Sequence, residues 1–136
     1  MKSPIENDFQ FSYLKWLLNN VNHVKKLHLE LCSKGLWSSN EDKTIWKSVI
    51  NADFIRRHCL PDEIIHLKYF HFYIRVERSL FIDNEKEIIN SFQIHPFFIN
   101  HQWTNVQCFY DDSQDELYQH IFSSDVKKFE WINILM

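Results

Sequence analysis

The residues of this chain whose types could carry chemistry are its histidines, its cysteines and one acidic group. The eight histidines stand at positions 23, 28, 58, 66, 71, 95, 101 and 120, without an HExxH motif or a Cys-His zinc spacing. The acidic group, residues 111–116, lacks the glycine and the ligand frame of an EF-hand, so we interpret it as a solvated, helix-capping group. We therefore expect neither a metal nor another cofactor.

The nucleophilic residues also lack the flanks of known catalytic sites. No serine lies in a GxSxG turn, and Cys32, Cys59 and Cys108 lack both a CxxC partner and a recognisable catalytic flank. The single glycine, Gly35, excludes the glycine-rich loops that cradle phosphates. We predict a non-catalytic protein with reduced thiols. The open alternative is a small α/β enzyme, hydrolytic or metal-dependent, whose site is assembled from distant residues.

Composition and charge set the class of the molecule. The 136 residues are 45% apolar and 24% charged, which is typical of one ordered globular domain. The net charge is −3 and the basic residues come in small separate groups, so we expect no nucleic-acid partner. No segment approaches the eighteen apolar residues of a membrane span. We predict a cytoplasmic or nuclear protein with a polar tail at 1–9 and one domain at 10–136.

The apolar periodicity predicts helices that alternate with strands. Residues 24–31 and 67–76 alternate apolar and polar side chains, as a half-buried strand does. Pro61 and Pro96 follow helical patterns and are expected to end them. The predicted helices cover residues 10–20, 39–58, 84–95 and 116–122, and the predicted strands cover 24–31, 67–76, 106–110 and 129–134.

Each predicted strand carries the same apolar-x-x-apolar-x-apolar frame. The frames are Val24, Leu27, Leu29; Leu67, Phe70, Phe72; Trp103, Val106, Cys108; and Val126, Phe129, Trp131. A leucine-rich repeat uses this spacing to send side chains from each strand into a shared core. The predicted fold is an irregular leucine-rich-repeat-like solenoid segment of the α/β class, with about four helix-strand units and a parallel sheet. Because the intervals between frames are unequal, a compact α/β domain stays open as the alternative.

Several runs together resemble one family. They are residues 24–29 (VKKLHL), 45–55 (IWKSVINADFI), 59–61 (CLP) leading to 70–74 (FHFYI), and 94–99 (IHPFFI) through 101–103 (HQW). Over residues 10 to 125 the chain resembles the C-terminal, leucine-rich-repeat-like portion of divergent F-box proteins that are expanded in some small invertebrates. The resemblance implies a substrate receptor whose repeats hold a target protein, while an F-box recruits the ubiquitin-ligase adaptor.

The F-box itself is not predicted in this chain. Residues 60–65 (LPDEII) read like the opening of an F-box, but a strand pattern follows where helices would continue. We therefore expect an adaptor to bind only if an F-box exists outside this chain. A further alternative is a truncated family member with no independent role, because the last residues, 131–136, form an apolar strand without a polar cap.

The predicted protein-binding residues lie on the strands, opposite the apolar frames. In a stacked array they would form rows: His28, His71, Gln107 and Glu130 in one, and Glu30, Tyr73, Phe109 and Ile132 in the next. Alternatively, loops or further repeats bury Phe109 and Ile132. The full predicted set is His28, Glu30, Tyr69, His71, Tyr73, Arg75, Gln107, Phe109 and Glu130. The sequence thus predicts a protein-protein interaction module of unknown target.

Overall fold

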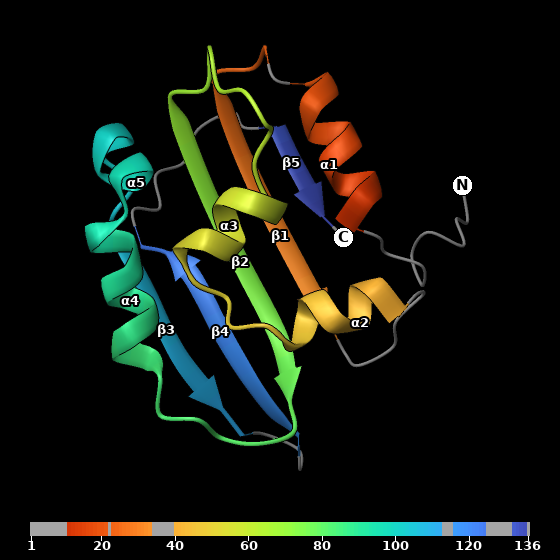
Figure 1. Ribbon diagram of the computed structural model, residues 1–136, viewed down its shortest axis with the longest axis vertical. Coiled ribbons are helices and arrows are strands. Elements are labelled where there is room, and N and C mark those ends of the chain that lie inside the picture. The colour runs from red at the N-terminus through yellow and green to blue at the C-terminus, as the bar shows by residue number, and fades with distance from the viewer. Residues whose placement is uncertain (1–10, 22, 34–39, 113–115, 125–131, 136) are drawn as a thin grey trace.

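The computed structural model of the chain describes residues 11–21, 23–33, 40–112, 116–124 and 132–135, and their elements form an α/β fold (Figure 1). The helices are α1 (Phe11–Asn20), α2 (Asn40–Lys47), α3 (Ala52–His58), α4 (Glu85–Ile94) and α5 (Pro96–His101). The strands are β1 (Lys26–Ser33), β2 (Tyr69–Arg78), β3 (Val106–Asp111), β4 (Leu117–Ser123) and β5 (Ile132–Leu135).

The strands form one sheet in the order β3-β4-β2-β1-β5. β1 pairs in parallel with β2 and with β5, whereas β4 runs antiparallel to both β2 and β3. The sheet is therefore mixed, and the prediction of a parallel sheet is wrong. β3 and β4 are antiparallel because a short connection joins them, and a hairpin can join only antiparallel strands.

One predicted helix, residues 116–122, is the strand β4. Gln119 and Ile121 lie in register with Val76 and Ile74 of β2, on the side that packs into the core. His120 lies between them in the alternation, and it belongs to the opposite face together with Tyr118. The apolar residues of this segment fit the period of a strand as well as the period of a helix. Hydrogen bonding to two neighbouring strands makes it a strand.

Two further helix boundaries differ from the predictions. The predicted helix 39–58 is divided into α2 and α3, because Asn51 takes an extended conformation and caps the second helix; the predicted cap at Ser39 lies outside the described residues. The residues after Pro96 form α5, which the sequence reasoning missed. Proline ends a preceding helix but also suits the first position of a new one, so Pro96 does both.

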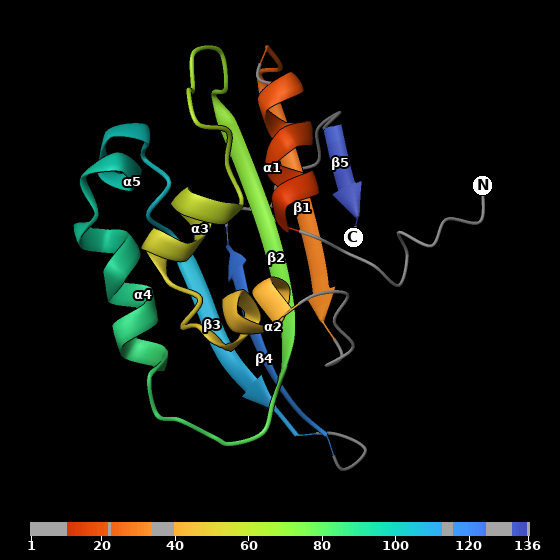
Figure 2. The same cartoon turned by 45° about the vertical axis from the view of Figure 1, so that its right-hand side comes forward.

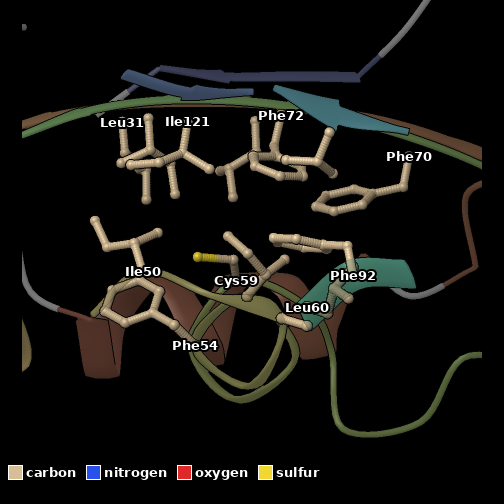
Figure 3. Packing of buried hydrophobic residues seen from close by; sticks show 14 of the residues in the cluster. Leu31, Ile50, Phe54, Cys59, Leu60, Phe70, Phe72, Phe92 and Ile121 are labelled. Atoms are coloured by element: carbon tan, nitrogen blue, oxygen red, sulfur yellow. The ribbon is translucent and has the colours of Figure 1, made fainter. Parts of the chain in front are cut away.

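All the described helices lie on one side of the sheet (Figures 1 and 2). Between the two layers, strand side chains such as Phe72 and Ile121 point at Phe92 and Leu60 on the helical side (Figure 3). The predicted alternation of β1 and β2 is confirmed, since the following residues are at most 7% exposed: Leu27, Leu29, Leu31, Phe70, Phe72, Ile74 and Val76. The other side of the sheet carries no described helix.

Removing the cap of α3 tests whether this short helix depends on its first turn. The Asn51 side-chain oxygen accepts a hydrogen bond from the Phe54 N–H at 3.0 Å. We expect Asn51→Ala to lower the free energy of unfolding by about 1 kcal/mol in urea denaturation, because an end donor loses its partner. Asn90→Ala, at an exposed position inside α4, is the control and should change it by less than about 0.5 kcal/mol. Equal losses in both variants would contradict this role of the cap.

Candidate binding face of the sheet

The candidate site is the face of the sheet that points away from the helices. Because residues paired across strands share a face, the register alone assigns the side chains to it. It places the following predicted binding residues there together: His28, Glu30, Tyr69, His71, Tyr73, Arg75, Gln107 and Phe109. Glu130 lies outside the described residues.

The rows across this face differ from the predicted rows. His28 does pair with His71, and Glu30 with Tyr73. However, β4 lies between β2 and β3, so Gln107 aligns with the row of Tyr73, and Phe109 aligns with the row of Arg75. In β5, Ile132 pairs with Leu27 and not with Glu30, so its predicted place in the second row is wrong. Phe109 is 44% exposed, so its predicted alternative, burial by loops, is also wrong.

Four rings from three strands make up what we call the aromatic cluster: Tyr73, Phe109, His120 and Phe122. Tyr118 lies on the same face, beside Arg75. His120 stacks on Phe109 with 4.6 Å between the ring centroids, and on Tyr73 at 5.8 Å. The ring of Phe122 meets both neighbours edge-on at 5.9 Å. Such pairs each contribute about 0.5–1.5 kcal/mol beyond burial, so the cluster forms an ordered surface.

The polar atoms at the centre of this cluster are engaged with one another. The Tyr73 hydroxyl lies 2.5 Å from His120 Nδ1. Burial lowers the pKa of His120 and raises the pKa of Tyr73, so the neutral imidazole accepts a hydrogen bond from the protonated phenol. The proton on His120 then lies on Nε2, which is buried and 3.6 Å from Asp111 Oδ2. The Nδ1 lone pair of His120 is thus engaged by the Tyr73 hydroxyl, and its Nε2–H faces the Asp111 carboxylate.

Arg75 lies beside the cluster and carries a positive charge. Its guanidinium lies 4.6 Å from the centre of the Tyr118 ring, and its Nη2 donates to Cys32 Sγ at 3.2 Å. The hydrogen bond to Cys32 is the main cause that raises the pKa of Arg75. Its Nε is buried without a hydrogen-bond partner, and no carboxylate pairs with the guanidinium within the described part of the chain. Among the described residues, this charge therefore has no carboxylate partner.

His71 lies at the other end of the same face, where Ser123, at the carboxyl end of β4, contacts it. The Ser123 Oγ lies 2.6 Å from His71 Nδ1 and accepts the Phe72 backbone N–H at 2.9 Å. Burial lowers the pKa of His71, whose ring meets that of His28 at 4.6 Å. A hydroxyl and an imidazole at this distance form the pair that a nucleophile and its base would need. Here the same contacts also fasten β4 to the backbone of β2.

Sequence reasoning missed the contribution of β4 to this face. Tyr118, His120 and Phe122 were assigned to a helix, although they alternate with Leu117, Gln119 and Ile121 across the whole segment. That period of two was the available signal. With β4 included, the face gains His120 at its centre and the rings of Tyr118 and Phe122.

Two classes of site are absent from the described residues. No described helix has the length and apolarity that crossing a membrane requires. Within the same ranges, no three histidine, cysteine, aspartate or glutamate side chains gather as a metal site would require. Comparisons with protein-family models, with curated proteins and with solved structures find no match to this chain.

Proposed function

We propose that this chain is a non-catalytic protein-recognition module that binds its partner through the aromatic cluster and Arg75. The observation that carries the proposal is Arg75 itself, a cation with no carboxylate partner in the described part of the chain. It lies on the same face as the exposed Phe109 and the stacked rings. Tyrosine, phenylalanine and arginine are the side chains enriched where proteins meet. The site would take a partner protein that presents an acidic side chain beside an apolar one.

The resemblance to the repeat portion of F-box proteins supports a substrate-receptor role. In this proposal β1, α2, α3 and β2 form one helix-strand repeat, since β1 and β2 are parallel as repeat strands are. The antiparallel β3–β4 hairpin then closes an irregular solenoid instead of extending it. A ubiquitin-ligase adaptor would join only through an F-box outside this chain. The module would act in the cytoplasm or nucleus.

Two substitutions on the face test the proposal. A partner is first captured from cell extract and identified, then purified and titrated against the chain. We expect Arg75→Gln and Phe109→Ser each to weaken its affinity about tenfold or more, because each removes a central contact. Arg57→Gln and Ile99→Ser are matched controls at exposed positions of α3 and α5, and they should bind like the wild type.

The same experiment can overturn the proposal. If the Arg75 and Phe109 variants keep the wild-type fold by circular dichroism and bind the purified partner unchanged, the face is not the binding site. The Ser123–His71 contact favours a hydrolase as the second candidate. Turnover of an activated ester by the purified chain, abolished by Ser123→Ala, would contradict the non-catalytic assignment.

A further inference from the structure

A cavity of about 470 Å³ opens on the opposite side of the sheet, at the carboxyl end of β2. The end of α2, the turn into α3, the segment between β2 and α4, and β3 all contribute to its wall. Crevices at the carboxyl ends of strands are common ligand sites in α/β proteins, and this volume is in the range that holds small organic molecules. The residues that decide what it could bind are Trp46, Val49, Arg78, Leu80, Ile82 and Tyr110.

Among the charged residues of this wall, Arg78 occupies a core-facing position of β2, after Ile74 and Val76. Its Nη1 donates to the Trp46 carbonyl at 2.8 Å, and its Nη2 donates to the Ser48 carbonyl at 3.1 Å. Its Nε donates to Gln119 Oε1 at 3.2 Å. Every one of these partners is neutral.

The Arg78 guanidinium therefore has N–H donors and a positive charge that these contacts leave unmatched. It carries five N–H groups, of which these contacts use three. Burial is the main cause that lowers the pKa of Arg78, although an arginine stays protonated at neutral pH. No carboxylate of the described residues forms an ion pair with it. A half-buried cation without a counter-ion is costly, and a bound anion would relieve that cost.

The rim of the cavity is apolar and open to solvent. Val49 is 48% exposed, Leu80 70% and Ile82 56%. The neighbouring Phe81, 59% exposed, meets the Tyr110 ring edge-on at 4.7 Å. Lys47 and Glu77 also line the wall, but their charges are opposite and cancel. The net positive charge of the site is therefore that of Arg78. A patch of this kind around a polar centre is typical of a ligand site.

We propose that this cavity binds a small organic carboxylate that carries an apolar chain. The carboxylate would accept hydrogen bonds from the unused Arg78 N–H groups, and the chain would lie against Val49, Leu80 and Ile82. A single guanidinium surrounded by apolar side chains suits a monoanion better than a phosphate, which recruits several donors. The same chemistry occurs in a free medium-chain acid and at the C-terminus of a peptide ending in an apolar residue.

Matched ligand pairs test the chemistry directly on the intact chain. Octanoate and octanamide differ only in charge, and so do acetyl-Gly-Leu with a free carboxylate and its C-terminal amide. By calorimetry, with amide chemical shifts to locate binding, we expect the preferred acid to bind at least tenfold more tightly than its amide. Shifts should centre on residues 79–84 and Trp46. The acid that binds more tightly shows whether the site prefers a free medium-chain acid or the C-terminus of a peptide.

Substitutions then test the assigned residues. Arg78→Gln should abolish the preference for the acid, whereas Arg75→Gln, on the opposite face of the same strand, should keep it. Because Arg78 also holds two backbone carbonyls, Leu80→Asp provides a second test: it places a negative charge at an exposed position of the rim. We expect Leu80→Asp to weaken acid binding at least fivefold, and the exposed control Ile99→Asp to have no effect.

Several results would overturn this inference. They are an acid that binds no better than its amide, no binding by either acid, or folded Arg78→Gln and Leu80→Asp variants that bind like the wild type. The partner-binding experiment uses the opposite face of the sheet, so either proposal can fail while the other stands.

Discussion

Phe92→Ala is expected to lower the free energy of unfolding by about 3–5 kcal/mol. The Phe92 side chain is fully buried in α4, where its ring stacks on Phe72 at 5.8 Å and meets Phe98 edge-on at 5.0 Å. Its removal leaves a cavity between the sheet and two helices, because close-packed neighbours relax only partly. Urea denaturation followed by circular dichroism measures the loss.

The control for this prediction is an exposed phenylalanine. Phe81, in the segment between β2 and α4, is 59% exposed, so Phe81→Ala removes the same side chain with little loss of burial. We expect it to change the free energy of unfolding by less than about 1 kcal/mol. A loss of that small size in Phe92→Ala would contradict the central position of Phe92 in the core.

Acidification from pH 7.5 to pH 5.5 is expected to destabilise the fold, because burial lowers the pKa of His58, His71 and His120. Below the ordinary histidine pKa of 6.5, the unfolded chain binds protons that the folded chain does not. The free energy of unfolding therefore falls as the pH drops through 6.5 toward the folded-state pKa values. The pKa of Asp62 is also lowered, first by its hydrogen bond to Lys15, so that carboxyl titrates below this window.

Histidine variants show which side chains cause this pH dependence of stability. His120→Gln removes a titrating group while keeping an acceptor for the Tyr73 hydroxyl, so we expect a shallower decline of the urea midpoint between pH 7.5 and 5.5. His66→Gln, at an exposed position, should leave the decline unchanged. A midpoint that rises on acidification, or an identical slope in the His120 variant, would contradict burial as the cause.

The sequence predicted the fold best where one period dominates. β1 and β2 alternate apolar and polar residues along their length, and Phe11, Leu14 and Leu18 mark the buried side of α1. In β4 both periods fit, since Leu117 and Ile121 are four residues apart and also belong to an alternating pattern. The local pattern alone cannot decide between helix and strand here, because the strand depends on hydrogen bonds to β3 and to β2, and β2 is distant in sequence.

The candidate face was predictable in part for the same reason. Alternation alone puts Tyr73 and Arg75 on the side opposite the core, whereas the neighbours of β3 depend on where β4 enters the sheet. Arg78 was missed as a functional residue, although it continues the row of Ile74 and Val76. An arginine at the end of an apolar row is a signal that a reader of the sequence could use.

The pairing of β1 with β5 also affects the order in which the strands of the sheet can form during folding. Leu27 pairs with Ile132, so this contact closes a loop of about a hundred residues. Such closure has a high entropic cost and makes folding slow. On the ribosome, β1 and β2 can pair early, but one edge of β1 stays open until residues 132–135 emerge. During synthesis the nascent chain therefore exposes an unpaired strand edge, which is the kind of surface that pairs with other chains.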